Sequence, residues 1–297
     1  MPYLDEIAEQ LNVLFKLDEF EPDLPFSHLV PGVYKETGIK LERYLDSTFL
    51  KTFHGLMIRN GQSVSKTYCI VFLSKEMLDA VLRRGEKDVL LISHHPLVME
   101  TSNRGFLPLS ETYLVEMQKR AISVYVLHTP LDVHNKISTS RALARELGLE
   151  ELQGCYQGPG GYAGVYGRFS QPVEFDDLLQ RVTDVTGVGD LDYIRNHQAI
   201  RSVGIIAGGT DTDGIMETAA LGCDLLLTGT YYNLVQNEIG QRYREEFDRI
   251  RDSLEISLIG CSHYASEAVV MRTDMVELCL DRFGIDCEFI PQEDPWY

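Results

Sequence analysis

The sequence predicts an α/β protein built from two similar α/β units, each a mostly parallel sheet flanked by helices. Three observations predict this class. Short β-rich runs alternate with amphipathic helical stretches, first over residues 68–147 and again over residues 176–290. Several of these runs lack polar alternation, as expected for strands that are covered on both faces. A glycine-rich segment, residues 154–167, interrupts the alternation between the two blocks.

The glycine-rich segment sets the expected division of the chain. It fits either a domain boundary or a bent hairpin at a sheet edge, since glycine permits tight turns and close approach. We therefore expect an N-terminal α/β unit with an N-terminal extension over residues 1–153, and a C-terminal α/β unit over residues 154–297. A chain of 297 residues has room for two domains of about 150 residues.

The expected elements of the first unit follow from local periodicity. Residues 3–14 place Leu4, Ile7 and Leu11 on one helical face, whereas the acidic, proline-containing stretch 17–31 predicts no clear element. The remaining elements are strands at 68–73, 88–92 and 123–127, and helices at 75–84, 111–120 and 138–147.

The second unit repeats this rhythm without repeating the residues. A helix is expected at 176–185, before the first strand of the block. Strands then follow at 201–207, 224–227, 254–259 and 286–290, and helices at 213–221, 233–250 and 265–283.

Composition excludes several classes of function. The chain has 27 basic and 45 acidic residues, and its net charge of −18 disfavours non-specific binding to nucleic acid. No apolar stretch approaches the length of a membrane span, and the acidic first ten residues do not resemble a signal peptide, so a cytoplasmic protein is expected. Its six cysteines form no CxxC pair and are interpreted as reduced core residues.

Candidate metal ligands follow three predicted strands, where α/β proteins gather their ligands. The first pair is His94 and His95, at a point where the chain is expected to leave the strand and both rings can face one site. His128 and Asp132 follow the next strand, although Asp132 could equally cap a turn. His134 is either a neighbour of the site or a histidine without a role in it.

The third candidate pair is His263 and Glu267, four residues apart at the opening of a predicted helix. Residues with this spacing share a helix face, so one metal ion could take both side chains. Ser262 could cap the same helix, and the two roles are compatible.

Together these segments predict a centre for two divalent ions. Five candidates, His94, His95, Asp132, His263 and Glu267, are too many for one tetrahedral zinc ion and too few to saturate two ions. Such a centre would generate hydroxide at neutral pH and polarise a phosphoryl or carbonyl oxygen. The ligand types suit zinc, iron, manganese or cobalt.

The remaining motifs predict less. The loop 207–214 is neither GxGxxG nor a P-loop, and a tight turn with an Asp or Thr cap is the favoured interpretation. Thr228-Gly229-Thr230 either lines the same cleft or only turns the chain. Cys261 is interpreted as a core residue.

These motifs, in this order, resemble those of the Nif-three-like family of dinuclear-metal-centre hexameric proteins, some of which are labelled GTP cyclohydrolase type-two homologues. The resemblance covers residues 55–297. It rests on His54-Gly55-Leu56-Met57, Ile92-Ser93-His94-His95-Pro96-Leu97, His128-Thr129-Pro130-Leu131-Asp132, Ala207-Gly208-Gly209, the run 224–229, and Gly260-Cys261-Ser262-His263-Tyr264-Ala265-Ser266-Glu267.

The resemblance implies that His94, His95, Asp132, His263 and Glu267 bind the metals, with His128 beside them. It also implies that the metals lie in a crevice between the two units and that the protein forms a hexamer. We expect a hydrolase acting on an unidentified small substrate of phosphoryl or nucleotide type, with His128 handling a proton or orienting a group. The alternative is a non-enzymatic oligomer that binds or carries metal.

Overall fold

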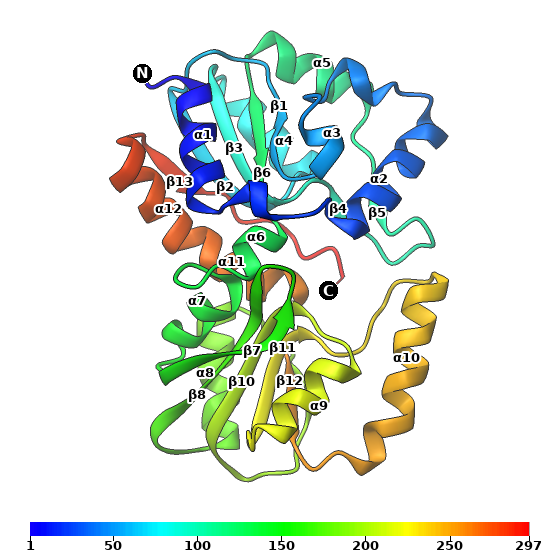
Figure 1. Ribbon diagram of the computed structural model, residues 1–297, viewed down its shortest axis with the longest axis vertical. Helices are drawn as coiled ribbons and strands as arrows, with labels where there is room; N and C mark the ends of the chain where they lie inside the picture. The colour runs from blue at the N-terminus through cyan, green and yellow to red at the C-terminus, as the bar shows by residue number, and fades with distance from the viewer. Residues whose placement is uncertain (297) are drawn as a thin grey trace. The chain divides into compact units, whose positions relative to one another are not determined.

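The computed structural model describes residues 1–296 of the chain, which divide into two compact units (Figure 1). The first unit comprises Met1–Leu131 and Met271–Pro295, and the second comprises Asp132–Val270 with Trp296. The boundary expected at residues 153 and 154 falls inside a strand, Glu150–Gly158, so the compact units differ from that division. Among the described residues, no helix combines the length and apolar character that a membrane span requires.

The first unit contains a five-stranded sheet in the order β1-β6-β3-β2-β13. Its strands are β1 (Gly55–Ile58), β2 (Lys66–Phe72), β3 (Val89–His95), β6 (Ser123–Val126) and β13 (Cys287–Phe289). Only β1 pairs antiparallel with its neighbour, so this sheet is mostly parallel, as predicted. Every residue of β2 and β3 is buried, which agrees with the unbroken apolar runs in the sequence.

Helices and a small hairpin complete the first unit. The helices are α1 (Leu4–Leu14), α2 (Leu24–Thr37), α3 (Phe49–Thr52), α4 (Lys75–Arg84), α5 (Glu111–Lys119) and α12 (Asp274–Leu278), and the hairpin is β4 (Val98–Met99) with β5 (Phe106–Leu107). The limits of α4 match the prediction because the sequence supplies both ends. The side chain of Ser74 accepts a hydrogen bond from the Met77 amide, and Gly85 adopts a left-handed conformation at the other end.

The second unit contains a six-stranded sheet in the order β7-β8-β10-β11-β12-β9. Its strands are β7 (Glu150–Gly158), β8 (Gly161–Glu174), β9 (Asp192–Ile194), β10 (Ala199–Gly209), β11 (Leu225–Thr230) and β12 (Ser257–Gly260). Only β10, β11 and β12 run parallel to one another. The other pairings are antiparallel, so this sheet is more mixed than the prediction of a mostly parallel one.

The helices of the second unit are α7 (Thr139–Glu146), α8 (Phe175–Thr186), α9 (Thr212–Ala220), α10 (Glu238–Ile250) and α11 (His263–Arg272). The glycine-rich segment forms the hairpin of β7 and β8 at the sheet edge, one of its two predicted roles. The glycines of this hairpin allow close packing. A Cβ added at Gly154 would lie 2.4 Å from the ring of Tyr162 on the partner strand.

Three elements differ from their predicted limits. The helix expected at 265–283 is interrupted near Thr273, so that α11 and α12 are separate and belong mainly to different units. The helix expected from residue 233 begins at Glu238, because the Asn237 side chain caps it by accepting from the Gly240 amide. The last strand, β13, pairs with β2 and thus completes the first sheet, although the sequence rhythm placed it in the second unit.

Candidate metal-binding residues

Three histidines meet in the first unit. His94 and His95 are the last two residues of β3, and His128 follows β6, the strand beside it. The ring centroids of His94 and His95 are 4.7 Å apart, those of His95 and His128 are 4.7 Å apart, and those of His94 and His128 are 5.0 Å apart. Each ring offers a nitrogen within 4.8 Å of those of the other two. The strand continues through both histidines, so the expectation that the chain turns before them is wrong, yet their rings still converge.

Hydrogen bonds identify the ring nitrogen that His94 can offer to a metal. Its Nδ1 lies 2.8 Å from the carbonyl oxygen of Leu127, which can only accept, so Nδ1 carries the proton. The lone pair of the ring is therefore on Nε2. A histidine whose second nitrogen donates to a backbone carbonyl is the usual arrangement for a metal ligand, since this bond fixes both tautomer and ring orientation.

His128 is held in the same way by an acidic partner that the sequence did not reveal. Its Nδ1 lies 2.8 Å from Oδ2 of Asp23, and the Thr129 hydroxyl donates to the same oxygen over 3.0 Å. Asp23 also caps α2 by accepting from the Phe26 amide. The Phe26 ring packs against His128 with a centroid distance of 4.6 Å, so one helix start supplies both a polar and an apolar contact.

The environment of Asp23 keeps its carboxyl group ionised. Burial alone would raise the Asp23 pKa, but the charge and hydrogen bond of His128, together with the donors Thr129 and Phe26, lower that pKa to about 2. An ionised acceptor on Nδ1 of His128 leaves Nε2 as the nitrogen that can exchange a proton or bind a metal.

His54 supports the segment that precedes Asp23. Its Nε2 donates to the carbonyl oxygen of Glu21 over 3.0 Å, and its side chain is buried. Burial lowers the pKa of His54, so its ring is neutral near pH 7. This histidine, in the first motif of the resemblance, therefore has a structural role that helps to place Asp23.

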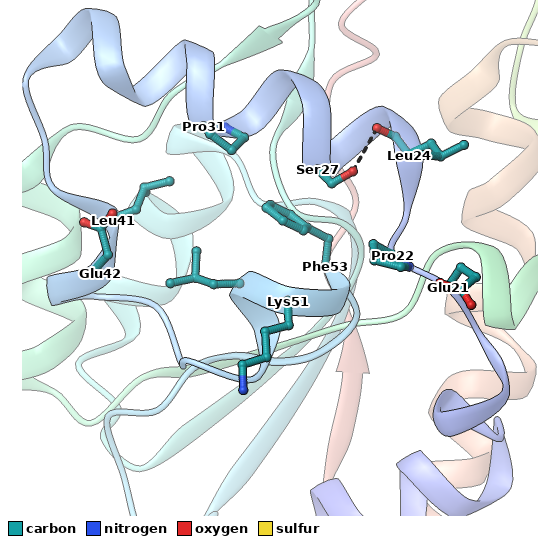
Figure 2. A pocket seen from close by; sticks show the side chains of 10 residues that line it. Glu21, Pro22, Leu24, Ser27, Pro31, Leu41, Glu42, Lys51 and Phe53 are labelled. Atoms are coloured by element: carbon teal, nitrogen blue, oxygen red, sulfur yellow. Dashed lines mark hydrogen bonds between the residues drawn. The ribbon is translucent and has the colours of Figure 1, made fainter.

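A hollow of about 850 Å³ lies on the other side of the same segment (Figure 2). Pro22 and Leu24 line it, whereas Asp23 between them turns its carboxylate to His128. Its wall combines apolar and charged side chains, among them Phe53 and Lys51. None of the predicted site residues is among its lining residues, so the hollow is separate from the histidine cluster.

In the second unit His263 and Glu267 share one face of α11, as their spacing predicts. His263 Nε2 lies 3.0 Å from Glu267 Oε1, and the Glu267 side chain is only 4% exposed. Ser262 precedes the helix and accepts from the Ala265 amide over 3.0 Å. The predicted cap is therefore present, and the two residues predicted as ligands lie side by side on one helix face.

Two glycines make room beside this pair. Gly208, at the end of β10, has a φ of +76°, and a Cβ built there would lie 2.5 Å from Glu267 Oε1 and 3.3 Å from His263 Nε2. A Cβ at Gly229, on β11, would lie 2.7 Å from the Cα of His263. The two strands and the helix thus approach closely only because both positions lack a side chain.

Ser266 ties the glycine loop to the helix. Its hydroxyl accepts from the Gly208 amide over 2.8 Å and lies 2.9 Å from the carbonyl oxygen of His263, to which it donates. One buried side chain therefore fixes the position of Gly208 against the turn that carries His263 and Glu267.

Asp132 is the predicted ligand that the structure does not bring into either group. It ends the short helix α6 (Thr129–Asp132), and its Oδ1 accepts from the Thr139 hydroxyl over 2.8 Å within the second unit. Among the described residues it is not part of a group of three ligand atoms lying within 4.8 Å of one another. His134 accepts from the Ile137 amide and so stabilises a local turn.

The other motifs took their expected structural roles. Asp211 caps α9 by accepting from the Gly214 amide over 3.0 Å, as expected for a tight turn. Cys261 is fully buried, as predicted for a core residue, and burial raises its pKa to about 12.

The donor chemistry of both groups fits a divalent metal ion. Imidazole and carboxylate groups are the common non-thiolate ligands of zinc, iron, manganese and cobalt. The side chains of His94, His95 and Glu267 are buried, and those of His128 and His263 are partly buried. Because residue 208 is a glycine, no side chain at this position fills the space beside Glu267 and His263. These buried His and Glu groups could therefore hold a metal ion.

Comparison with known proteins places these residues in a family context. The family model described as Duf34/NIF3 (NGG1p interacting factor 3) matches residues 51–295. A protein of Deinococcus radiodurans named "GTP cyclohydrolase 1 type 2 homolog" is 27% identical over 241 residues, covering 80% of this chain and 84% of its own. A protein of Pyrococcus abyssi with the same name is 27% identical over 248 residues, covering 81% of this chain and 89% of its own.

Solved structures share the fold over nearly the whole chain. A structural-genomics protein named ybgI, of unknown function, aligns with a TM-score of 0.67 and 20% identity, covering 99% of this chain and 100% of its own. A protein from Thermus thermophilus aligns with a TM-score of 0.65 and 19% identity, covering 98% of this chain and 99% of its own. The N-terminal segment outside the family match therefore falls within these structural alignments.

Proposed function

We propose, since this chain belongs to the Duf34/NIF3 family, that it is a dinuclear-metal hydrolase acting on a small substrate of phosphoryl or nucleotide type. We assign the two divalent ions to His94, His95, Asp132, His263 and Glu267. The observation that carries this proposal is the pair of buried donor groups, the histidine cluster after β3 and β6 and the His263–Glu267 pair beside Gly208.

Each donor group is organised as a ligand set would be. His94 has its proton fixed on Nδ1 by a carbonyl, and Glu267 lies against a glycine whose missing side chain keeps space open. Asp132 is the weakest member of the set, since its Oδ1 already accepts from Thr139. Its second oxygen is the atom we assign to a metal.

Divalent ions held by such residues lower the pKa of water and polarise a phosphoryl oxygen, which is the chemistry a hydrolase requires. We assign His128 the role of moving a proton at Nε2. Asp23 holds Nδ1 of the same ring and stabilises the protonated form, as a carboxylate does for a general acid–base histidine.

We also propose a cytoplasmic homo-hexamer. The hexamer follows from the family resemblance, and a cytoplasmic location is consistent with six cysteines that are all free thiols. Light scattering coupled to size exclusion tests the assembly directly, because a hexamer of 33.7 kDa chains is well separated from a dimer.

Metal content of the purified protein tests the assignment of the site. His94→Ala and Glu267→Gln are each expected to lower the bound divalent metal, measured by elemental analysis against protein concentration. His28→Ala is the matched control, because His28 is exposed on α2. Metal content unchanged in both site variants would contradict the assignment.

Activity is tested separately on protein with its metal fully restored. A panel of phosphomonoesters, phosphodiesters, nucleotides and cyclic amides covers the substrate class. Hydrolysis that disappears with His128→Ala while metal content persists would support the proposal. A metal-loaded protein without hydrolysis on the whole panel, but with rapidly exchanging metal, would favour the non-enzymatic metal carrier instead.

A further inference from the structure

Three of the six cysteines form a cluster in the first unit, separate from the histidine group. Cys69 lies on β2, Cys287 on the neighbouring edge strand β13, and Cys279 at the end of α12. Their sulfur atoms all lie within 4.8 Å of one another, and those of Cys69 and Cys287 are 3.5 Å apart. All three side chains are buried and all three are free thiols.

The strand register explains why the sulfurs converge. β2 and β13 run parallel, with Cys287 opposite Thr67 and Phe289 opposite Cys69. Because alternate residues of a strand share a face, Cys69 and Cys287 are diagonal neighbours on one face of the sheet. Cys279 comes to the same face from the segment that leads from α12 into β13. Three elements of the first unit therefore contribute one thiol each.

The charged side chains on and beside the strands that carry the cluster balance one another, so they do not oppose the binding of a cation. Lys66 lies between Asp286 and Glu288, with both carboxylates 2.5 Å from its ammonium group, and Arg84 pairs with Glu288, so these four side chains sum to zero charge. The thiols of Cys279 and Cys69 hydrogen-bond to the sulfur of Cys287 and, with the charge of Lys66, lower the Cys287 pKa to about 5 against the opposing effect of burial. Of the three thiols, Cys287 is therefore the one that loses its proton most readily.

The number and softness of the donors define the ligand. Thiolates select soft ions, chiefly Cu(I), zinc and iron–sulfur clusters. A structural zinc ion takes four protein ligands and an iron–sulfur cluster four cysteines. Within the described chain the group contains three sulfurs and no histidine or carboxylate, so it is one donor short of both. Three sulfurs suffice for Cu(I), which is stable with two or three thiolates.

We propose that Cys69, Cys279 and Cys287 form a thiolate site for a single Cu(I) ion, distinct from the histidine and carboxylate site of the proposed function. Each S–Cu bond forms as the corresponding thiol gives its proton to solvent, with no change in oxidation state. The ion enters at β13, because Cys287 lies on the edge strand and is 5% exposed while Cys69 and Cys279 are fully buried.

A disulfide is the competing outcome. The 3.5 Å between the sulfurs of Cys69 and Cys287 is short enough for a small shift to reach the bond length of about 2.05 Å. That reaction removes two electrons and two protons and so requires an added oxidant. Intact-mass measurement after air exposure and thiol alkylation detects it.

Anaerobic titration of metal-free, reduced protein with Cu(I) tests the site, using bathocuproine disulfonate as the coloured competitor. Wild-type protein is expected to bind one Cu(I) ion per chain tightly enough to retain it in the presence of the competitor. We expect the Cu(I) affinity to fall by more than about 100-fold in each of the variants Cys69→Ser, Cys279→Ser and Cys287→Ser. This would exceed the loss of about 10–100-fold that is typical when a group that only orients a ligand is removed. Cys155→Ser is the control, since Cys155 is a buried cysteine on the edge strand of the other sheet.

Two further measurements keep the test decisive if a serine variant folds poorly. His95→Ala should retain the tight Cu(I), which separates this site from the histidine group. X-ray absorption at the copper edge of the unmodified protein should show sulfur neighbours alone. Nitrogen or oxygen neighbours, binding equal in the three cysteine variants and Cys155→Ser, or a disulfide formed in place of binding would overturn the proposal.

Discussion

Oδ2 of Asp23 lies 2.8 Å from Nδ1 of His128, a residue 105 positions further along the chain. This contact joins the stretch 17–31, whose sequence predicts no clear element, to the residue that we propose as the proton-transfer group. The same carboxylate caps α2 and accepts from Thr129, so the start of one helix orients the histidine. The N-terminal segment is therefore part of the site's supporting structure.

Replacing Asp23 tests how much the fold depends on that carboxylate. Asp23→Ala removes a helix cap and the acceptor of two side-chain donors, and we expect it to lower the free energy of unfolding by about 2–4 kcal/mol. Asp23→Asn retains one acceptor oxygen and should cost less. Urea unfolding measures both, and equal stability of wild type and Asp23→Ala would contradict the assigned role.

Gly208 tests the space beside the ligand pair. In Gly208→Ala the new Cβ would meet Glu267 Oε1 at 2.5 Å, so we expect loss of bound metal at this pair. Gly187→Ala is the matched control, because Gly187 has a similar φ of +79° but nothing within 4 Å of an added Cβ. Both variants should lose about 1–2 kcal/mol of stability from the left-handed backbone, and only the first should lose metal by elemental analysis. Metal retained by Gly208→Ala would contradict the predicted crowding.

Ser266 is predicted to position the glycine loop without binding metal itself. Ser266→Ala leaves the buried Gly208 amide without its acceptor, which we expect to cost about 1–3 kcal/mol in the free energy of unfolding. Metal affinity should fall by about 10–100-fold, as for the loss of a group that orients a ligand. Isothermal titration with zinc measures this, and an unchanged affinity would show that the loop holds its place without Ser266.

Asp224 is predicted to make the second unit sensitive to acid. Burial opposes its ionisation, but hydrogen bonds from the Ser202 and Arg201 amides and the Ser202 hydroxyl hold the Asp224 pKa below its usual value. A lowered pKa in the folded state adds stability that is complete above the unfolded pKa of about 3.9 and is lost as the pH falls through the folded value.

Asp224→Asn should therefore be less stable than wild type at pH 7, and the gap should narrow as the pH falls below about 4. Thermal midpoints recorded from neutral to acidic pH measure the gap. Asp177→Asn serves as the control, since Asp177 is exposed on α8. A gap that stays constant across this range would exclude the proposed contribution of the carboxylate.

Much of the fold could be predicted because its elements carry local signals. α4, with Ser74 at its start and Gly85 at its end, has the predicted limits, and the buried strands β2 and β3 appear as unbroken apolar runs. The pairing of β13 with β2 could not be predicted. It depends on contacts between residues more than 200 positions apart, and no local periodicity records such a partner.

The site was predictable to the extent that its residues follow strands or share a helix turn. His94 and His95 are adjacent and His263 and Glu267 are one turn apart, so sequence spacing alone brings each pair together. Asp23 precedes Leu24 and Pro25, a pattern typical of a helix start, but nothing in that pattern indicates His128 as its partner. The cysteine cluster was missed for the same reason, since its three members come from separate elements.

The late return of β13 to the first sheet has a consequence for how the chain matures. Residues 132–270 leave the ribosome as one continuous stretch that contains every strand of the second sheet, whereas one edge of β2 stays unpaired until β13 has been synthesised. The first unit thus contains the first residues of the chain but gains its edge strand β13 only after the second unit has been synthesised. A stop codon placed just before Cys287 would therefore remove a strand from the first unit, while Asp132–Val270 would keep every strand of its own sheet.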